Sequence, residues 1–298
     1  MGVFHIIGDN LIIISYILSE LGGAYDRKKI DTGTDHLLAD IEDGVLTITL
    51  NRPEARNAMS RELVLALVDQ LKDAQENSDV KCVVLTGAGK GFCAGGDVKA
   101  MGAGPGESPP TIDESINRQR YQQRAISGAL YSMTKPTLAS LPGAAAGAGL
   151  SIALACDLRI MASNAIMTTA FRHVGFSGDY GGTFFMTQLV GAAKARELFF
   201  LSSRISADEA LKLGLTNWVV DPEELGNKTK EIASQLASGP PIAMQYMKEN
   251  LNRAISSGDL EDCMDLECTH HIHCAKTEDH KNAVQAFINK TKPIFNGR

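Results

Sequence analysis

The sequence predicts an α/β protein in which a buried sheet is covered by helices. Two observations carry this prediction: short runs of β-branched residues alternate with helical patterns, and glycine-rich turns follow two of the predicted strands. The chain has 298 residues, of which 44% are hydrophobic and 21% are charged. It is therefore long enough for one large domain, or for one domain with a smaller helical part.

The first predicted elements are two strands that flank a helix. Residues 45–50 alternate β-branched residues at period two between turn residues, which is typical of a strand. A helix is expected to begin at Ser60, a favourable N-cap, because Leu63, Leu67 and Leu71 are spaced for one buried face. Residues 81–86 are almost continuously apolar, which favours a strand inside a sheet that helices cover.

The same order of elements then recurs. A glycine-rich crossover leads to a small-residue turn at residues 94–96, and residues 118–132 predict a helix. Residues 137–141 predict a third strand, and a second small-residue turn, Gly147-Ala148-Gly149, opens an apolar segment that ends at Cys156-Asp157. Because ligands bind at strand ends in layered α/β folds, these two turns are the first candidates for a site.

The rest of the chain is mostly helical, with breaks at Gly, Pro or Ser. Expected helices span residues 191–201, 206–213, 222–238, 241–256, 260–274 and 278–290, with a strand-like join at 217–220. We place a soft boundary near residue 220, between a mixed core, residues 36–220, and a helical part, residues 221–298.

Residues 1–35 are expected to be a leader of unassigned role. Their apolar run, residues 11–18, is too short to span a bilayer, which needs about 20 apolar residues. The leader also lacks the basic start and the cleavage site of a signal peptide. We therefore expect no membrane association.

Charge and cysteine content exclude other classes of protein. The net charge of -6, without a basic tract, argues against nucleic acid as a partner. Six cysteines without a secretory signal favour reduced thiols and a cytoplasmic location. Residues 267–280 hold cysteines and histidines but no CxxC or HxxxH pair, so we expect a solvated helix there and no metal.

The glycine turns allow more than one chemistry. A P-loop is excluded because its spacing is absent, and neither turn gives a clean dinucleotide fingerprint. Residues 149–153 resemble a nucleophile elbow with one substitution, which would make Ser151 the nucleophile of a hydrolase. The interpretation that uses both turns is an oxyanion hole, in which two backbone N–H groups stabilise an enolate.

Several stretches in the same order resemble the crotonase superfamily, the enoyl-CoA hydratase/isomerase family, from about His36 to Arg298. They are residues 50–53 with 56–58, 91–99, 142–157, 181–183 and 286–290.

This resemblance implies a spiral of ββα turns with a C-terminal helical region that assembles a trimer or a dimer of trimers. It also implies an acyl-CoA thioester as substrate, coenzyme A as part of that substrate, and no tightly bound cofactor.

By the same resemblance, the thioester oxygen would lie between the backbone N–H groups of Gly96 and Ala148. Ala148 departs from the usual glycine, and its methyl group narrows the approach of the thioester to this N–H.

The resemblance also implies contacts to the coenzyme A. The backbone near Arg56 and Ala58 would face the coenzyme A, and Lys99 would reach its phosphates. Phe287 and Lys290 would close the adenine end from a neighbouring subunit.

The resemblance breaks down at the acids. Hydratases of this family use two glutamates, but the matching positions hold Ser151 and Phe171, neither of which can be a general base near neutral pH. The remaining acid is Asp179, which resembles the acid of dienoyl-CoA isomerases and of the ring-opening isomerase of phenylacetyl-CoA breakdown. Apolar neighbours such as Phe171 and Phe176 would raise its pKa.

We therefore expect an isomerase that moves a double bond with Asp179 as its single acid/base and with Ser151, Phe171 and Phe176 lining the substrate pocket. Three alternatives stay open: a hydratase with a non-standard mechanism, an acyl-CoA-binding protein whose chemistry has decayed, and a merely structural turn aspartate at Asp179. Ser151 could also hydrogen-bond substrate or a water, with His173 orienting it, although packing is the simpler role for both.

Overall fold

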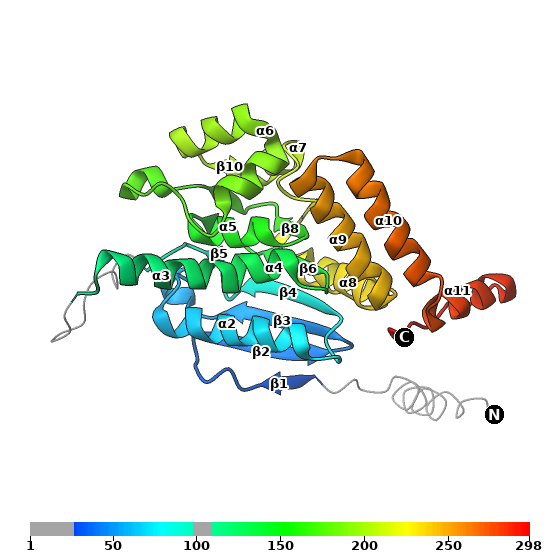
Figure 1. Cartoon of the computed structure of the whole chain (residues 1–298). Helices are drawn as coiled ribbons and strands as arrows, with labels where there is room; N and C mark the ends of the chain where they lie inside the picture. The colour runs from blue at the N-terminus through cyan, green and yellow to red at the C-terminus, as the bar shows by residue number, and fades with distance from the viewer. Residues whose placement is uncertain (1–26, 98–108) are drawn as a thin grey trace, which may run out of the picture.

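The computed structural model describes residues 27–97 and 109–298. Most of the predicted leader and Lys99 lie outside these described residues. Figure 1 shows a layered core, with a helical arm extending from it on one side.

Two sheets form the core. The larger sheet has the strand order β1-β2-β3-β4-β6-β8-β11, and the smaller has the order β10-β9-β7-β5. The strands are β1 (Lys28–Ile30), β2 (Leu37–Glu42), β3 (Val45–Leu50), β4 (Cys82–Gly87), β5 (Gly91–Cys93), β6 (Thr137–Leu141), β7 (Ala144–Ala146), β8 (Leu158–Ala162), β9 (Ile166–Thr168), β10 (Ile205–Ser206) and β11 (Trp218–Val220).

The chain moves between the two sheets in a repeating order. Strands β4, β6 and β8 run parallel in the larger sheet, and each is followed by a strand of the smaller sheet and then by a helix. This is the spiral of ββα turns that the resemblance implies. The smaller sheet pairs β5, β7 and β9 in parallel, so the turns that follow these strands lie along one edge.

The helices are α2 (Arg61–Glu76), α3 (Ile112–Gln123), α4 (Ala129–Ser132), α5 (Ala148–Ala155), α6 (Gly182–Leu201), α7 (Ala207–Lys212), α8 (Leu225–Ala237), α9 (Pro241–Ser257), α10 (Leu260–Cys274) and α11 (Glu278–Asn289). Short helical turns are η1 (Pro53–Ala55), η3 (Arg124–Gly128), η4 (Phe171–Val174) and η5 (Pro222–Glu224). In the described ranges, no helix is long and apolar enough to cross a membrane.

The first predicted elements are confirmed. Strand β3 covers the predicted residues, and α2 begins after Ser60, whose side chain accepts a hydrogen bond from the Leu63 N–H. Leu63, Leu67 and Leu71 are fully buried on one face of α2, because their spacing repeats once per helical turn.

Two predicted helix starts are wrong. The helix expected at residue 118 begins at Ile112, since Thr111 and Glu114 form a capping box that the sequence displays as Thr-x-x-Glu. The helix expected at residue 191 is preceded by nine further helical residues, and Gly191, with φ of 74°, is the break between the two segments.

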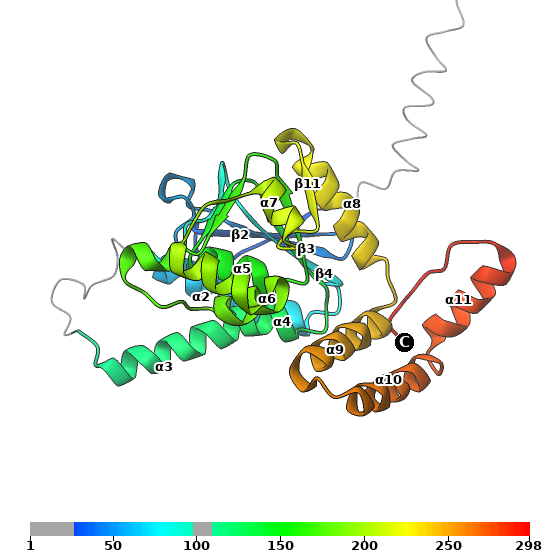
Figure 2. The ribbon, with the colours of Figure 1, turned by 90° about the horizontal axis from the view of Figure 1, so that it is seen from above.

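Strand β11 and helix α8, on either side of the boundary placed near residue 220, both belong to the core. Strand β11, expected only as a join, pairs with β8 at the edge of the larger sheet. Helix α8 contacts β3, β4, β6 and β8, so it covers a face of that sheet. Helices α9, α10 and α11 form the arm seen in Figures 1 and 2.

A buried ion pair attaches this arm to the core. The ammonium of Lys248, on α9, lies 2.9 Å from a carboxylate oxygen of Asp157 and donates to the carbonyl of Leu130 at 2.8 Å. Asp157 also accepts hydrogen bonds from the backbone and the hydroxyl of Thr137. The Lys248 side chain is only 9% exposed, so its charge depends on these protein partners.

We expect Lys248→Ala to lower the free energy of unfolding by about 3 kcal/mol, because it leaves the Asp157 carboxylate without its cation. Lys230→Ala is the matched control: Lys230 pairs with Glu42 but is 67% exposed, so its loss should cost less than about 1 kcal/mol. Urea unfolding of both variants measures the difference, and equal losses would contradict a special role for the buried pair.

Candidate active site

The two predicted small-residue turns lie side by side. Strands β5 and β7 are neighbours in the smaller sheet, and Gly95 and Gly147 follow them within two residues. A Cβ atom built on Gly95 would lie 3.0 Å from the Ala146 carbonyl oxygen and 3.3 Å from the Ala148 nitrogen. The turns are therefore in direct backbone contact.

The second turn leaves the N–H group of Ala148 without a backbone acceptor among the residues that the structure describes. Gly147 has φ of 53° and ψ of -126°, a conformation open to glycine, and it turns the chain abruptly from β7 into α5. Ala148 is the first residue of α5, so its N–H has no acceptor within the helix. Within the described residues, neither the Ala148 N–H nor the Gly96 N–H donates a hydrogen bond.

The backbone of residues 56–59 supports the first turn. The Ala94 N–H donates to the Arg56 carbonyl at 3.0 Å, and the Met59 N–H donates to the Gly95 carbonyl at 2.8 Å. Arg56 and Asn57 both have positive φ, 54° and 56°, which bends this segment around the turn. Arg56 and Ala58 thus lie beside the turn that holds Gly96.

Two polar side chains fix this support. Asn57 is fully buried and donates to the carbonyls of Ala88 and Gly91 at 3.0 and 2.8 Å. The Arg52 guanidinium lies 2.9 Å from the carboxylate of Asp97 and donates to the Ala58 carbonyl at 2.6 Å. No role was predicted for Arg52 or Asp97, because no local sequence pattern pairs residues 45 positions apart.

Strand β5 and helix α5 also approach closely, and together with the two turns and residues 56–59 they form the backbone frame of the site. A Cβ atom on Gly149 would lie 2.4 Å from the Cys93 carbonyl oxygen and 2.6 Å from the Cys93 Cβ. Cys93 is fully buried, as expected of a small core residue, and burial raises the pKa of its thiol to about 12.

Asp179 lies close to this frame. It interacts electrostatically with the Cys93 thiol and with the Tyr180 phenol, and its charge raises the pKa of both groups. Burial raises the pKa of Asp179 itself to about 6, because desolvation disfavours the charged carboxylate. One carboxylate oxygen, Oδ1, is buried and has no hydrogen-bond partner among the described residues.

Aromatic rings pack on both sides of the turn that carries Asp179. Phe199 lies against Gly178, where a Cβ atom would be 3.3 Å from its ring, and Phe185 lies against Gly181 at 2.8 Å by the same measure. Phe171 is buried, stacks on Phe199 with ring centroids 6.0 Å apart, and approaches Gly147. Phe176, by contrast, is 53% exposed, so it adds little to the desolvation of the acid.

The structure does not fit Ser151 as a nucleophile. Its side chain is 1% exposed on the first turn of α5, and its hydroxyl donates to the Gly147 carbonyl at 3.2 Å. A nucleophile elbow requires an exposed hydroxyl at a strand-to-helix turn. The suggestion that His173 orients Ser151 is also wrong, since His173 is exposed on η4 and makes no hydrogen bond to that hydroxyl.

Ser151 instead packs against Gly182. A Cβ atom on Gly182 would lie 2.3 Å from the Ser151 hydroxyl and 3.1 Å from its Cβ. The start of α6 thus occupies the space into which a longer side chain at position 151 would extend.

Phe287 and Lys290 lie far from this group of residues. Both are on or next to α11, at the opposite end of the molecule from α3 in Figures 1 and 2, and the Phe287 side chain is 84% exposed. Within one chain, neither residue lies near the two small-residue turns. That they contribute to the site of a neighbouring subunit stays a prediction.

The Cys/His segment forms helix α10 as expected, but it is not uniformly solvated. His270 is 7% exposed, stacks on Tyr246 with ring centroids 4.0 Å apart, and hydrogen-bonds Asn250 at 2.6 Å. Its environment is therefore the contact between α9 and α10.

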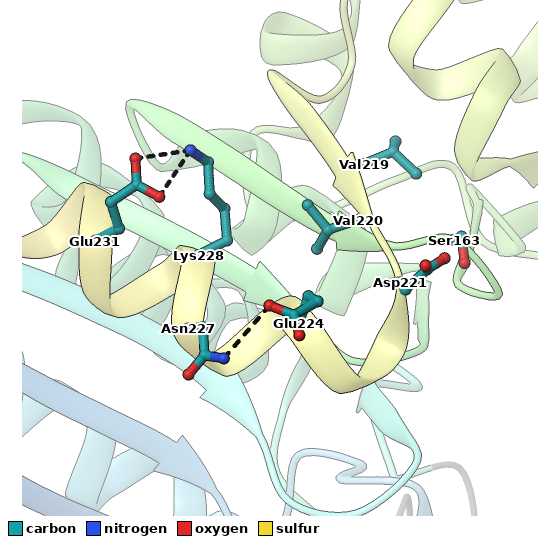
Figure 3. Close-up of a pocket in the computed structure, with 8 residues that line it drawn as sticks. All are labelled: Ser163, Val219, Val220, Asp221, Glu224, Asn227, Lys228 and Glu231. Atoms are coloured by element: carbon teal, nitrogen blue, oxygen red, sulfur yellow. Dashed lines mark hydrogen bonds and ion pairs between the residues drawn. The ribbon is translucent and has the colours of Figure 1, made fainter.

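A groove of about 580 Å³ lies elsewhere, between β11 and α8, and Figure 3 draws the residues that line it. Asp221, Glu224 and Glu231 surround it, and Lys228 is paired with Glu231 at 2.8 Å. None of the predicted site residues lines this groove, so the candidate site remains at the two small-residue turns.

The fold and these motifs define a known class of protein. The family model described as enoyl-CoA hydratase/isomerase matches residues 40–298, and the chain belongs to this family, the crotonase superfamily. It is an enzyme of that class, because its curated relatives are named as enoyl-CoA hydratases and isomerases.

Three similar proteins illustrate the range within the class. The 1,2-epoxyphenylacetyl-CoA isomerase of Escherichia coli is 33% identical over 89% of this chain and 99% of its own. The short-chain-enoyl-CoA hydratase of Clostridium acetobutylicum is 35% identical over 87% and 96%. The crystal structure of an enoyl-CoA hydratase from Bacillus anthracis, 31% identical, superposes with a TM-score of 0.81 over 88% of this chain and 100% of that one.

We expect Gly149→Ala to destabilise the protein by about 2 kcal/mol or more, because the methyl group would overlap the Cys93 carbonyl. Gly226→Ala is the matched control, since Gly226 lies on α8 with open space where a Cβ would be, and alanine there should be neutral or stabilising by up to about 1 kcal/mol. Thermal unfolding measures both, and a tolerated Gly149→Ala would contradict the close approach.

Proposed function

We propose that this enzyme moves a double bond within an enoyl-CoA thioester, with Asp179 as its single acid/base. The observation that carries the proposal is the buried carboxylate of Asp179, whose pKa is raised to about 6 beside the two small-residue turns. A general base works best when its pKa lies near the working pH. At pH 7 about nine in ten such carboxylates are ionised and ready to accept a proton.

The proposed oxyanion hole consists of the N–H groups of Gly96 and Ala148. Its support is the direct contact between the two turns and the absence, among the described residues, of another acceptor for either amide. As Asp179 removes a proton from the acyl chain, negative charge moves to the thioester oxygen, where two fixed donors would stabilise the dienolate. Asp179 would then return a proton, exchanged in part with solvent while the carboxyl group holds it, to another carbon of the same chain, so that no other reactant is consumed.

Isomerisation is favoured over hydration by the side chains at the two other acid positions. Ser151 is buried and bonded to a backbone carbonyl, and Phe171 is apolar, so neither can activate water. The names of the relatives include both activities and do not decide between them. The aromatic rings around Asp179 and the Escherichia coli relative support testing aryl-derived as well as linear esters.

The proposed function also includes substrate binding and assembly. We propose that Arg56, Ala58 and Lys99 bind the coenzyme A part of the substrate, that Phe171, Phe176 and Ser151 border the acyl group, and that no tightly bound cofactor is needed. We also propose a cytoplasmic trimer or dimer of trimers, in which Phe287 and Lys290 reach a neighbouring site. Exposed apolar side chains on the arm, among them Leu251, Leu260 and Phe287, support an interface there.

We expect Asp179→Asn to abolish isomerisation while binding of the CoA ester is retained, because asparagine cannot exchange a proton with carbon. Linear and aryl enoyl-CoA esters would be incubated in D₂O and followed by mass spectrometry. The wild-type enzyme should transfer deuterium to the acyl chain with a rate that falls below about pH 6, as Asp179 becomes protonated. Asp208→Asn, an exposed change on α7, is the control.

Other outcomes of this experiment would sink the proposal. Full activity of Asp179→Asn would exclude Asp179 as the acid/base. Addition of a whole solvent molecule to the ester would identify a hydratase. Tight binding of every ester without any exchange by the wild-type protein would identify an acyl-CoA-binding protein without catalysis.

The raised pKa also predicts a stability effect that needs no substrate. The folded pKa of Asp179, about 6, lies above its ordinary value of 3.8, so the stability of the folded state decreases as pH rises through 6. Asparagine carries no such charge. The advantage of Asp179→Asn over wild type in unfolding free energy should therefore grow by up to about 3 kcal/mol between pH 4 and pH 8. A difference that stays constant across urea titrations at these pH values would refute the burial of the charge.

A further inference from the structure

The peptide unit that joins Asp179 to Tyr180 is hydrogen-bonded at both ends. Its carbonyl, which belongs to Asp179, accepts a bond from the Gly182 N–H at 3.0 Å. Its N–H, which belongs to Tyr180, donates to the side-chain oxygen Oε1 of Gln123 at 2.6 Å. The second bond connects two parts of the chain that are 57 positions apart.

This peptide needs such support. Tyr180 has φ of 48°, in the left-handed region that residues with a Cβ rarely adopt. Tyr180 is also only 4% exposed, so its N–H would be buried without an acceptor if Gln123 were absent. The conformation of this turn therefore depends on the side chain of Gln123, which comes from helix α3.

The Asp179 side chain has little support of its own. Its Oδ1 atom is buried without a hydrogen-bond partner in the described part of the chain. Since side-chain bonds do not fix that oxygen, the direction of the carboxylate follows from the backbone to which it is attached.

From these contacts, and on the basis of the proposed function, we infer that Gln123 is a positioning residue: it holds the Asp179–Tyr180 peptide in place and so aims the carboxylate at the substrate beside the oxyanion turns.

The place of Gln123 in the fold suits this role. It is the last residue of α3, a helix without a buried residue, and it directly precedes η3, a π-helical turn that buries Ile126 and Ser127. A π turn inside a helix is frequent at functional sites, because it shifts the side chains that precede it relative to those that follow. Gln123 thus stands where the exposed helix enters the core.

The amide of Gln123 is also suited by its charge. Among the described residues, Asp179 interacts electrostatically with the Cys93 thiol on β5 and with the neighbouring Tyr180 phenol, and the pKa of each is raised so that both stay neutral. A neutral acceptor at position 123 binds the Tyr180 N–H without placing a second negative charge near the acid.

The test begins with Gln123→Met, which keeps the length of the side chain and removes the acceptor. We expect kcat for deuterium transfer to fall by about 10- to 100-fold while KM for the CoA ester stays within about twofold, because a misplaced base slows the chemistry and not the binding. Gln122→Met is the matched control, since Gln122 makes no side-chain hydrogen bond to the described chain. A kcat of Gln123→Met equal to that of the control would overturn the inference, whatever the change in melting temperature.

A second variant, Gln123→Glu, separates positioning from mere stabilisation. Its carboxylate can still accept the Tyr180 N–H, so kcat at high pH should be restored to within about threefold of wild type. The added charge disfavours ionisation of Asp179, so the acidic limb of the rate profile should move upward by roughly one pH unit. If the acidic limb of the rate profile stayed at the same pH in Gln123→Glu, the inference would be overturned, even if Gln123→Met failed to fold.

The same assay distinguishes this inference from the proposed function. If Asp179→Asn were fully active, the acid/base assignment itself would fail. If Asp179→Asn were inactive while Gln123→Met behaved like the wild type, the acid/base assignment would stand and only the role of Gln123 would be lost.

Discussion

The close backbone contact between the two small-residue turns is the constraint on which the rest of the site depends. Gly95, with φ of 91°, lies tightly against Ala146 and Ala148, and Gly149 lies against Cys93 with no room for a side chain. Because β5 and β7 are parallel neighbours, this contact directs two amides from different ββα turns to one edge of the smaller sheet. Buried polar side chains such as Asn57 then hold the supporting loop in register.

A second constraint is the burial of an acid among aromatic rings. Desolvation raises the pKa of Asp179 toward neutrality, and the same desolvation costs folding free energy whenever the carboxylate is ionised. Such a cost persists only where surrounding structure holds the group in place. Here that structure is the turn between Gly178 and Gly181, packed against Phe199 and Phe185 and bonded to Gln123.

The ion pair between Lys248 and Asp157, in which the Lys248 side chain is 9% exposed, attaches the arm of α9, α10 and α11 to the core. Asp157 lies two residues after the end of α5, the helix whose first residue, Ala148, we propose as one of the two oxyanion donors. The ion pair therefore links the arm to the same ββα turn that carries Ala148. The stacking of His270 on Tyr246 stiffens the arm in a similar way, between α9 and α10.

The sequence alone determined the class of fold, the family, most helices of the C-terminal part and the candidate acid. It could do so because periodicity, caps and glycine turns are local signals, visible at Ser60, at residues 260–274 and at Gly147. The early start of α3 was not predicted, although its capping box at Thr111 is visible in the sequence. Strand β8 was not predicted either.

Only the tertiary structure decided which residues meet. The bond from Tyr180 to Gln123, the pair between Arg52 and Asp97, and the packing of Ser151 against Gly182 join positions that are 31 to 57 residues apart. No local pattern encodes such contacts, because each depends on how helices and strands pack after they have formed. The direction of the pKa shift of Asp179 was predicted from its apolar neighbours, but the fold decided which rings bury the acid: Phe199 and Phe185 pack against its turn, whereas Phe176 is 53% exposed.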